Sequence, residues 1–220
     1  PRGARHMIDP SVLIAGATGV YGEEEIRRSY GEIAPVPAER VVEAADGFVV
    51  DLAGRALLCL DTPGHARHHI AIHDDRSSAF FTGDIFGLSY RELDSPSGAF
   101  IIPTTSPVQF EPDAAHHSID RMLGYEPEAM YLTHYGRVTE VARLANDLHE
   151  TIDAMVAMAK RHVADPDRER RIEADFADLY VDRAQRQGVT MDRDGIVRLL
   201  KIDIRLNAQG ILVWLDRGTH

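Results

Sequence analysis

Three short apolar runs in this chain each end abruptly in a side chain that can bind a metal ion. The ends of these runs read Thr62-Pro63-Gly64-His65, Phe81-Thr82-Gly83-Asp84 and Leu132-Thr133-His134. A strand fixes the direction of a ligand and the loop that follows leaves it accessible, so we predict that His65, Asp84 and His134 bind a metal. Two imidazoles and one carboxylate suit a divalent ion such as zinc, which points to metal-assisted hydrolysis.

The pattern around these runs predicts strands followed by helices. Alternation and apolar runs predict four strands in succession and a fifth before His134, at residues 48–52, 55–60, 69–73, 79–82 and 130–133. Ala53-Gly54 is expected to form the tight turn of a hairpin between the first two. Short helices are expected at residues 23–30 and from Asp113 to about Leu123.

After His134 the chain is predicted to be helical to its end. Apolar residues recur there at helical spacing in three stripes, beginning with Val138, Val141 and Leu144. We therefore expect two domains, a sheet-containing domain of residues 1–136 and a helical extension of residues 137–220. The apolar stripes suit a helical extension that packs on the sheet or forms a homodimer contact.

Composition narrows the classes of function. Lys and Arg number 24 against 35 Asp and Glu, a formal charge of −11, so nucleic acid is not a favoured partner. We find in this sequence no signal peptide and no apolar stretch long enough to span a membrane. Cys59 is the only cysteine, which excludes an intrachain disulfide and fits a cytoplasmic location.

The three motif ends resemble the later metal-binding motifs of the metallo-β-lactamase superfamily, especially its glyoxalase II-like hydrolases. The likeness covers roughly residues 45–137. It implies an α/β (α+β) fold, the αββα sandwich of that superfamily, present here in part and followed by the C-terminal helical extension.

The same resemblance implies roles for individual residues. His65 would bind one metal, Asp84 would bridge two metals as the catalytic carboxylate, and His134 would bind the second. His69 would lie behind these ligands and orient them. The implied cofactor is a pair of zinc ions, with manganese or iron as alternatives. The implied activity is attack of a metal-bound hydroxide on a small-molecule ester, thioester, lactone, lactam or phosphoester.

One motif of that superfamily, His-x-His-x-Asp-His, does not occur in this sequence. We expect residues upstream of Pro1 to supply it, since the chain starts as if in the middle of a domain. Two alternatives to the hydrolase stay open: a mononuclear iron sulfur dioxygenase on the same fold, whose site takes two histidines and one aspartate, and a degenerate scaffold protein without catalytic activity.

Some patterns compete with this interpretation. Residues 12–22 read like a strand that runs into the Gly-rich turn of a dinucleotide-binding domain, but no second strand follows, so a helix or loop is expected. His116-His117 looks like a metal pair, but neighbours on a helix diverge, and surface or capping roles are expected for them, with His149 solvated. Residues 87–112, with Tyr90 and Phe100, are expected to form a substrate lip.

Overall fold

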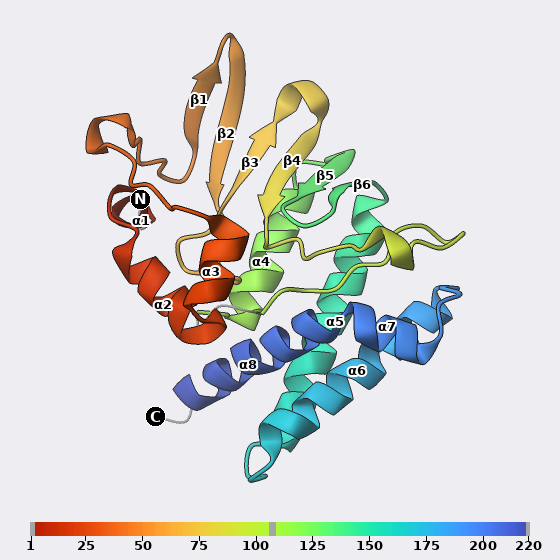
Figure 1. Cartoon of the computed structure of the whole chain (residues 1–220). Helices are drawn as coiled ribbons and strands as arrows, with labels where there is room; N and C mark the ends of the chain where they lie inside the picture. Colours follow the sequence, from red (N-terminus) through yellow and green to blue (C-terminus); the bar gives the residue numbers. More distant parts are fainter. Residues whose placement is uncertain (1–2, 106–108, 219–220) are drawn as a thin grey trace. The chain divides into compact units, whose positions relative to one another are not determined.

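The computed structural model describes residues 3–105 and 109–218. The chain divides into two compact units, Pro1–Asp46 and Gly47–His220 (Figure 1). The boundary expected after residue 136 lies within the second unit. None of the helices in the described ranges combines the length and the apolar character that a membrane crossing requires.

The first unit is made of short helices. These are α1 (Ala4–Ile8), α2 (Ser11–Tyr21), α3 (Glu23–Tyr30) and the 3-10 turn η1 (Ala38–Arg40). The predicted helix at residues 23–30 is thus confirmed. Residues 12–21 of the Gly-rich stretch lie in α2, so the expected helix or loop is confirmed and no strand leads into these glycines.

The second unit is built on a six-stranded sheet. Its strands follow the chain in order: β1 (Phe48–Leu52), β2 (Arg55–Asp61), β3 (Ile70–Asp74), β4 (Ala79–Gly83), β5 (Ala129–Leu132) and β6 (Gly136–Val138). Only β4 and β5 pair in parallel, and the other neighbours are antiparallel. The five predicted strands are confirmed. The prediction of helix throughout the region after His134 is wrong at β6, which is too short to show a period in the sequence.

One face of the sheet is buried under helices. Leu60, Phe80 and Met130 point into a core that also receives Ile119 and Met122 from helix α4 (Pro112–Leu123). The opposite face is open at Phe81, which is 45% exposed and whose ring stacks on that of Tyr131. Phe80 and Thr82 are buried and Phe81 between them is exposed, because successive side chains of a strand point to opposite faces of the sheet.

The C-terminal helices continue the same core. They are α5 (Val141–Arg161), α6 (Arg168–Arg186), α7 (Arg193–Leu199) and α8 (Lys201–Arg217). Their apolar stripes bury Leu148, Phe176 and Ile211 in one cluster with Phe80 of the sheet. The mixed α/β class predicted from the sequence is confirmed.

The long connection between β4 and α4 is mostly interior rather than an exposed lip. Phe100 is only 3% exposed and belongs to the core, and Tyr90 donates a hydrogen bond to Asp203 of α8. The predicted lip is therefore wrong at Phe100, because its ring packs inward with the neighbouring isoleucines. Residues 106–108 of the predicted lip lie outside the described residues.

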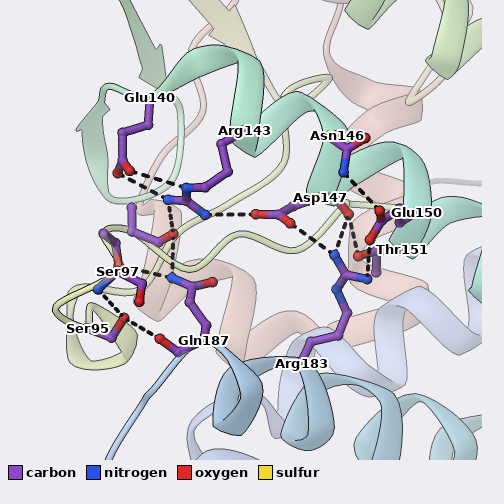
Figure 2. A network of polar contacts seen from close by, with 12 residues as sticks. Ser95, Ser97, Glu140, Arg143, Asn146, Asp147, Glu150, Thr151, Arg183 and Gln187 are labelled. Carbon is purple, nitrogen blue, oxygen red and sulfur yellow. Dashed lines mark hydrogen bonds and ion pairs between the residues drawn. The ribbon is translucent and has the colours of Figure 1, made fainter.

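A polar network anchors this connection to α5 and α6 (Figure 2). Asp147 accepts hydrogen bonds from Arg143 at 2.8 Å and from Arg183 at 3.2 Å, so one carboxylate joins the two helices. Arg143 and Gln187 both donate to the carbonyl oxygen of Ala99. The network therefore fixes the backbone of the connection near residue 99.

Asn207 of α8 holds the same connection closer to its end. Its side chain accepts from the Thr105 N–H at 2.8 Å and donates to the Pro103 carbonyl at 2.9 Å and to the Tyr180 hydroxyl at 2.9 Å. Asn207 is 2% exposed, so if its side chain were removed, water could not reach these partners and hydrogen-bond to them in its place.

We predict that Asn207→Ala lowers the free energy of unfolding by about 3 kcal/mol, because buried donors and acceptors lose their partner. Gln209→Ala is the matched control: it removes an amide from the same helix whose hydrogen bond to Glu169 is exposed, and it should cost less than about 0.5 kcal/mol. Urea denaturation measures both variants. Equal losses would contradict this role of Asn207.

Candidate metal centre

The strand directions bring the three predicted ligands to one edge of the sheet. β2 and β4 both run antiparallel to β3, and β5 runs parallel to β4. The carboxyl ends of β2, β4 and β5 therefore lie at the same edge. His65, Asp84 and His134 each follow one of these ends within a few residues.

At this edge the Asp84 carboxylate lies between two imidazoles. Nε2 of His134 is 3.0 Å from Oδ1 of Asp84, and Nε2 of His65 is 4.0 Å from Oδ2. Each histidine thus faces a different carboxylate oxygen. The side chains of His65, Asp84 and His134 are 15%, 26% and 49% exposed, so the cluster opens to solvent on the side of His134.

Thr104 sets the orientation of His65. Nδ1 of His65 lies 3.1 Å from the Thr104 carbonyl oxygen and 2.9 Å from its hydroxyl. A carbonyl only accepts, so Nδ1 carries the proton, and Nε2 presents a lone pair toward Asp84. Burial lowers the pKa of His65, against the opposing effect of Asp84, and so favours this neutral form.

Thr104 was not among the residues singled out in the sequence. Its hydroxyl also donates to the Asp84 carbonyl oxygen at 2.9 Å, so one side chain fixes two of the three predicted ligands. It comes from the long connection between β4 and α4. No local pattern in the sequence connects such a residue to the motif at His65.

His69 uses both ring nitrogens and keeps none for a metal. The Asp84 backbone N–H donates to Nε2 at 3.0 Å, and Nδ1 lies 2.9 Å from the Thr62 hydroxyl. Burial, together with the nearby His65, lowers the pKa of His69 to about 4, so the ring is neutral at pH 7. This arrangement suits the predicted orienting role.

Close contacts with neighbouring atoms leave no room for a side chain at Gly64 and Gly83. Gly83 has φ +55°, and a Cβ placed on it would lie 2.3 Å from Nε2 of His69. Gly64 has φ +134°, and its Cβ would lie 2.4 Å from the Cα of Ala115 in α4. The turn at Gly83 can therefore lie against His69, and the turn at Gly64 against α4, only because each of these residues lacks a side chain.

The chemistry of the donors suits a divalent metal, but in this structure the side chains of His134 and Asp84 contact each other directly. Catalytic zinc sites usually take three protein ligands of these types. Within the described ranges, no group of three or more His, Cys, Asp or Glu side chains is arranged to hold a metal ion. His134 contacts Asp84 directly, so metal binding requires a small adjustment of these side chains.

Two other histidines, outside the candidate centre, contact each other, which the sequence did not predict. His116 of α4 and His149 of α5 were expected to be surface or solvated residues. Instead the two rings meet edge to edge, with centroids 4.8 Å apart and Nδ1 atoms 2.5 Å apart, whereas His117 is exposed as expected. The signal that could have found them is the repeated His-x-x-x-Asp spacing, at His116 and Asp120 and again at His149 and Asp153.

The chain thus has a mixed α/β fold with two histidines and a carboxylate just after the carboxyl ends of β2, β4 and β5. No protein-family model matches the chain. A metallo-β-lactamase fold-containing protein of Sulfurisphaera tokodaii is 31% identical over 101 residues, which is 46% of this chain and 35% of that protein. The matched stretch thus spans about a third of the relative.

Two solved structures share the fold. An archaeal metallo-β-lactamase superfamily protein from Sulfolobus tokodaii superposes with a TM-score of 0.55 at 22% identity, covering 89% of this chain and 68% of that chain. A metallo-β-lactamase family protein from Thermus thermophilus gives 0.54 at 17% identity, covering 91% and 63%. The chain is thus similar in sequence, over part of its length, to a metallo-β-lactamase fold-containing protein, and the solved structures show that the two share a fold.

We predict that Gly83→Ala destabilises the protein by at least about 1 kcal/mol more than Gly54→Ala. Both glycines have positive φ, but a Cβ at Gly54 meets nothing within 4 Å, whereas at Gly83 it meets His69. Gly54→Ala therefore reports backbone strain alone, about 1 kcal/mol. Denaturant unfolding measures both variants, and equal losses would refute the close contact.

The lowered pKa of His69 predicts a pH dependence of stability. Its ordinary value of 6.5 applies to the unfolded chain and about 4 to the folded one, so between these values the unfolded state binds more protons. The stabilisation is full above pH 6.5 and is lost as the pH falls toward 4. His69→Gln should show a smaller fall of the free energy of unfolding across this window. A fall as large as in the wild type would exclude a buried neutral His69.

Proposed function

We propose that this chain supplies His65, Asp84 and His134 to the divalent-metal centre of a hydrolase. The observation that carries the proposal is the placement of the Asp84 carboxylate between two imidazole Nε2 atoms at one edge of the sheet. The fold and the curated relative support it, since both are of the metallo-β-lactamase type.

Within this proposal each residue has a defined task. His65, held by Thr104, and His134 each offer an Nε2 atom. Asp84 offers an oxygen toward each histidine, so it can serve one ion or bridge two. A bound zinc or manganese ion would supply Lewis acidity and an activated water. Three donors complete the protein ligands of one zinc site but not of two.

The substrate class in this proposal is a small molecule with an ester, thioester, lactone, lactam or phosphoester group. These groups share the need for a polarised acceptor and an activated water, which one ligand set can serve. The exposed side of the centre at His134 is where such a substrate would enter.

A second candidate is a mononuclear iron centre of an oxygenase. Two histidines and one carboxylate are the ligand types of the facial triad that binds iron(II) in such enzymes. The same three residues would bind the metal in either enzyme, so the identity of the bound metal distinguishes the hydrolase from the oxygenase. Zinc or manganese supports the hydrolase, and iron supports the oxygenase.

We predict that the purified chain binds a divalent metal and that His134→Ala or Asp84→Asn reduces the bound metal. Each variant removes a donor of the centre, and loss of one ligand of three should weaken affinity at least about tenfold. Elemental analysis after equilibrium dialysis against zinc, manganese and iron(II) gives both the amount and the preference.

His162→Ala is the matched control, because His162 also faces a carboxylate, Asp175, with Nε2 to Oδ2 at 2.9 Å. It should bind as much metal as the wild type. Equal metal content in wild type, His134→Ala and Asp84→Asn would contradict the proposed centre and favour a scaffold without a metal here.

A further inference from the structure

A second group of metal-binding side chains joins α4 to α5 and includes none of the residues of the candidate centre. His116 and Asp120 lie one turn apart on α4, and His149 and Asp153 lie one turn apart on α5. Residues at this spacing share a helix face. The two helices pack together, so the two faces meet.

The two imidazoles meet through their Nδ1 atoms. Nδ1 of His116 lies 2.5 Å from Nδ1 of His149, and the ring planes are inclined by 19°. Each Nε2 atom faces a carboxylate from the opposite helix: His116 faces Asp153 at 3.1 Å, and His149 faces Asp120 at 3.0 Å. Two histidine–carboxylate contacts thus connect α4 to α5, one in each direction.

These contacts determine which ring nitrogens carry protons. Both carboxylates only accept hydrogen bonds, so the Nε2 atoms of His116 and His149 are the protonated ones. In a neutral imidazole the other nitrogen then bears a lone pair. Two lone pairs at 2.5 Å repel each other unless a cation lies between them. Only a proton or a metal ion can be that cation.

We propose that His116 and His149 form a binding site for a divalent transition metal of the zinc type, with the two Nδ1 atoms as ligands. Histidines that bind metals commonly donate their other N–H to a carboxylate, and here both do. The two carboxylates, Asp120 and Asp153, also balance the charge of a divalent ion.

The exposure of the site fits an ion that keeps water ligands. The side chains of His116 and His149 are each 24% exposed, so an ion enters from solvent after a small separation of the rings. Water completes the coordination shell, since the protein supplies two nitrogens. Such an ion links α4 to α5.

This link bears on the candidate metal centre through α4. Ala115, the neighbour of His116, packs against the turn at Gly64 that precedes His65. Ser118, from the same helix, donates a hydrogen bond to the Pro63 carbonyl at 2.6 Å. An ion between His116 and His149 therefore fixes the helix against which the His65 turn rests.

The test measures the rise in thermal midpoint, Tm, when zinc is added to the full chain. His134→Ala is the common background, so the candidate metal centre contributes little to the response. In that background zinc should raise Tm by several degrees. The rise should vanish when His116→Gln or His149→Gln is added, and persist with His117→Ala, which changes the exposed neighbouring histidine.

A second measurement separates binding from a loss of folding. Asp120→Asn and Asp153→Asn keep both nitrogen ligands and should weaken zinc affinity by about 10–100-fold without abolishing it. Circular dichroism checks that every variant folds. An undiminished rise in Tm with His116→Gln, or no rise in the His134→Ala background, would overturn the proposal and leave a histidine pair that shares a proton.

The outcome is independent of the proposed hydrolase centre. If the candidate centre binds no metal, wild type and His134→Ala respond equally to zinc, and His116→Gln still removes the response. If the His116 site fails, His116→Gln responds as its parent does, whatever happens at His134.

Discussion

His69 joins the ends of two strands through its two ring nitrogens, and the candidate metal centre depends on that connection. Thr62, at the end of β2, bonds to Nδ1, and the backbone N–H of Asp84, at the end of β4, donates to Nε2. The contact is possible because Gly83 lacks a side chain. A neutral, buried imidazole at this point holds the Asp84 carboxylate at a fixed place between His65 and His134, without itself competing for a metal.

Other segments of the second unit hold the residues of the candidate metal centre in place. The connection between β4 and α4 brings Thr104 to His65 and Asp84, and Asn207 of α8 holds that connection by its backbone. Helix α4 supports the turn before His65 through Ala115 and Ser118. The C-terminal helices therefore position the centre indirectly, because they fix the segments that contact its residues.

The sequence predicted the features that depend on neighbouring residues, but not the contacts between residues far apart in the chain. Strands with an alternating pattern, the hairpin at Gly54 and the three strand-end motifs are encoded within a few residues, so each was predictable. Strand β6 was missed because three residues show no period. Thr104 was missed because it reaches His65 by a contact between segments more than thirty residues apart. The repeated His-x-x-x-Asp spacing marks a face on each of two helices, but helix periodicity cannot reveal that His116 meets His149 across them.

The central claim is that three side chains from separate strand ends converge on one ion beside the His69 support. A crystal structure of the chain grown with zinc, with anomalous diffraction recorded at the zinc edge, tests it most directly. We expect an anomalous peak bonded to Nε2 of His65, the carboxylate of Asp84 and Nε2 of His134, with metal–nitrogen distances of about 2.0–2.1 Å. No peak beside Asp84, with the direct contact between Asp84 and His134 retained, would contradict the account.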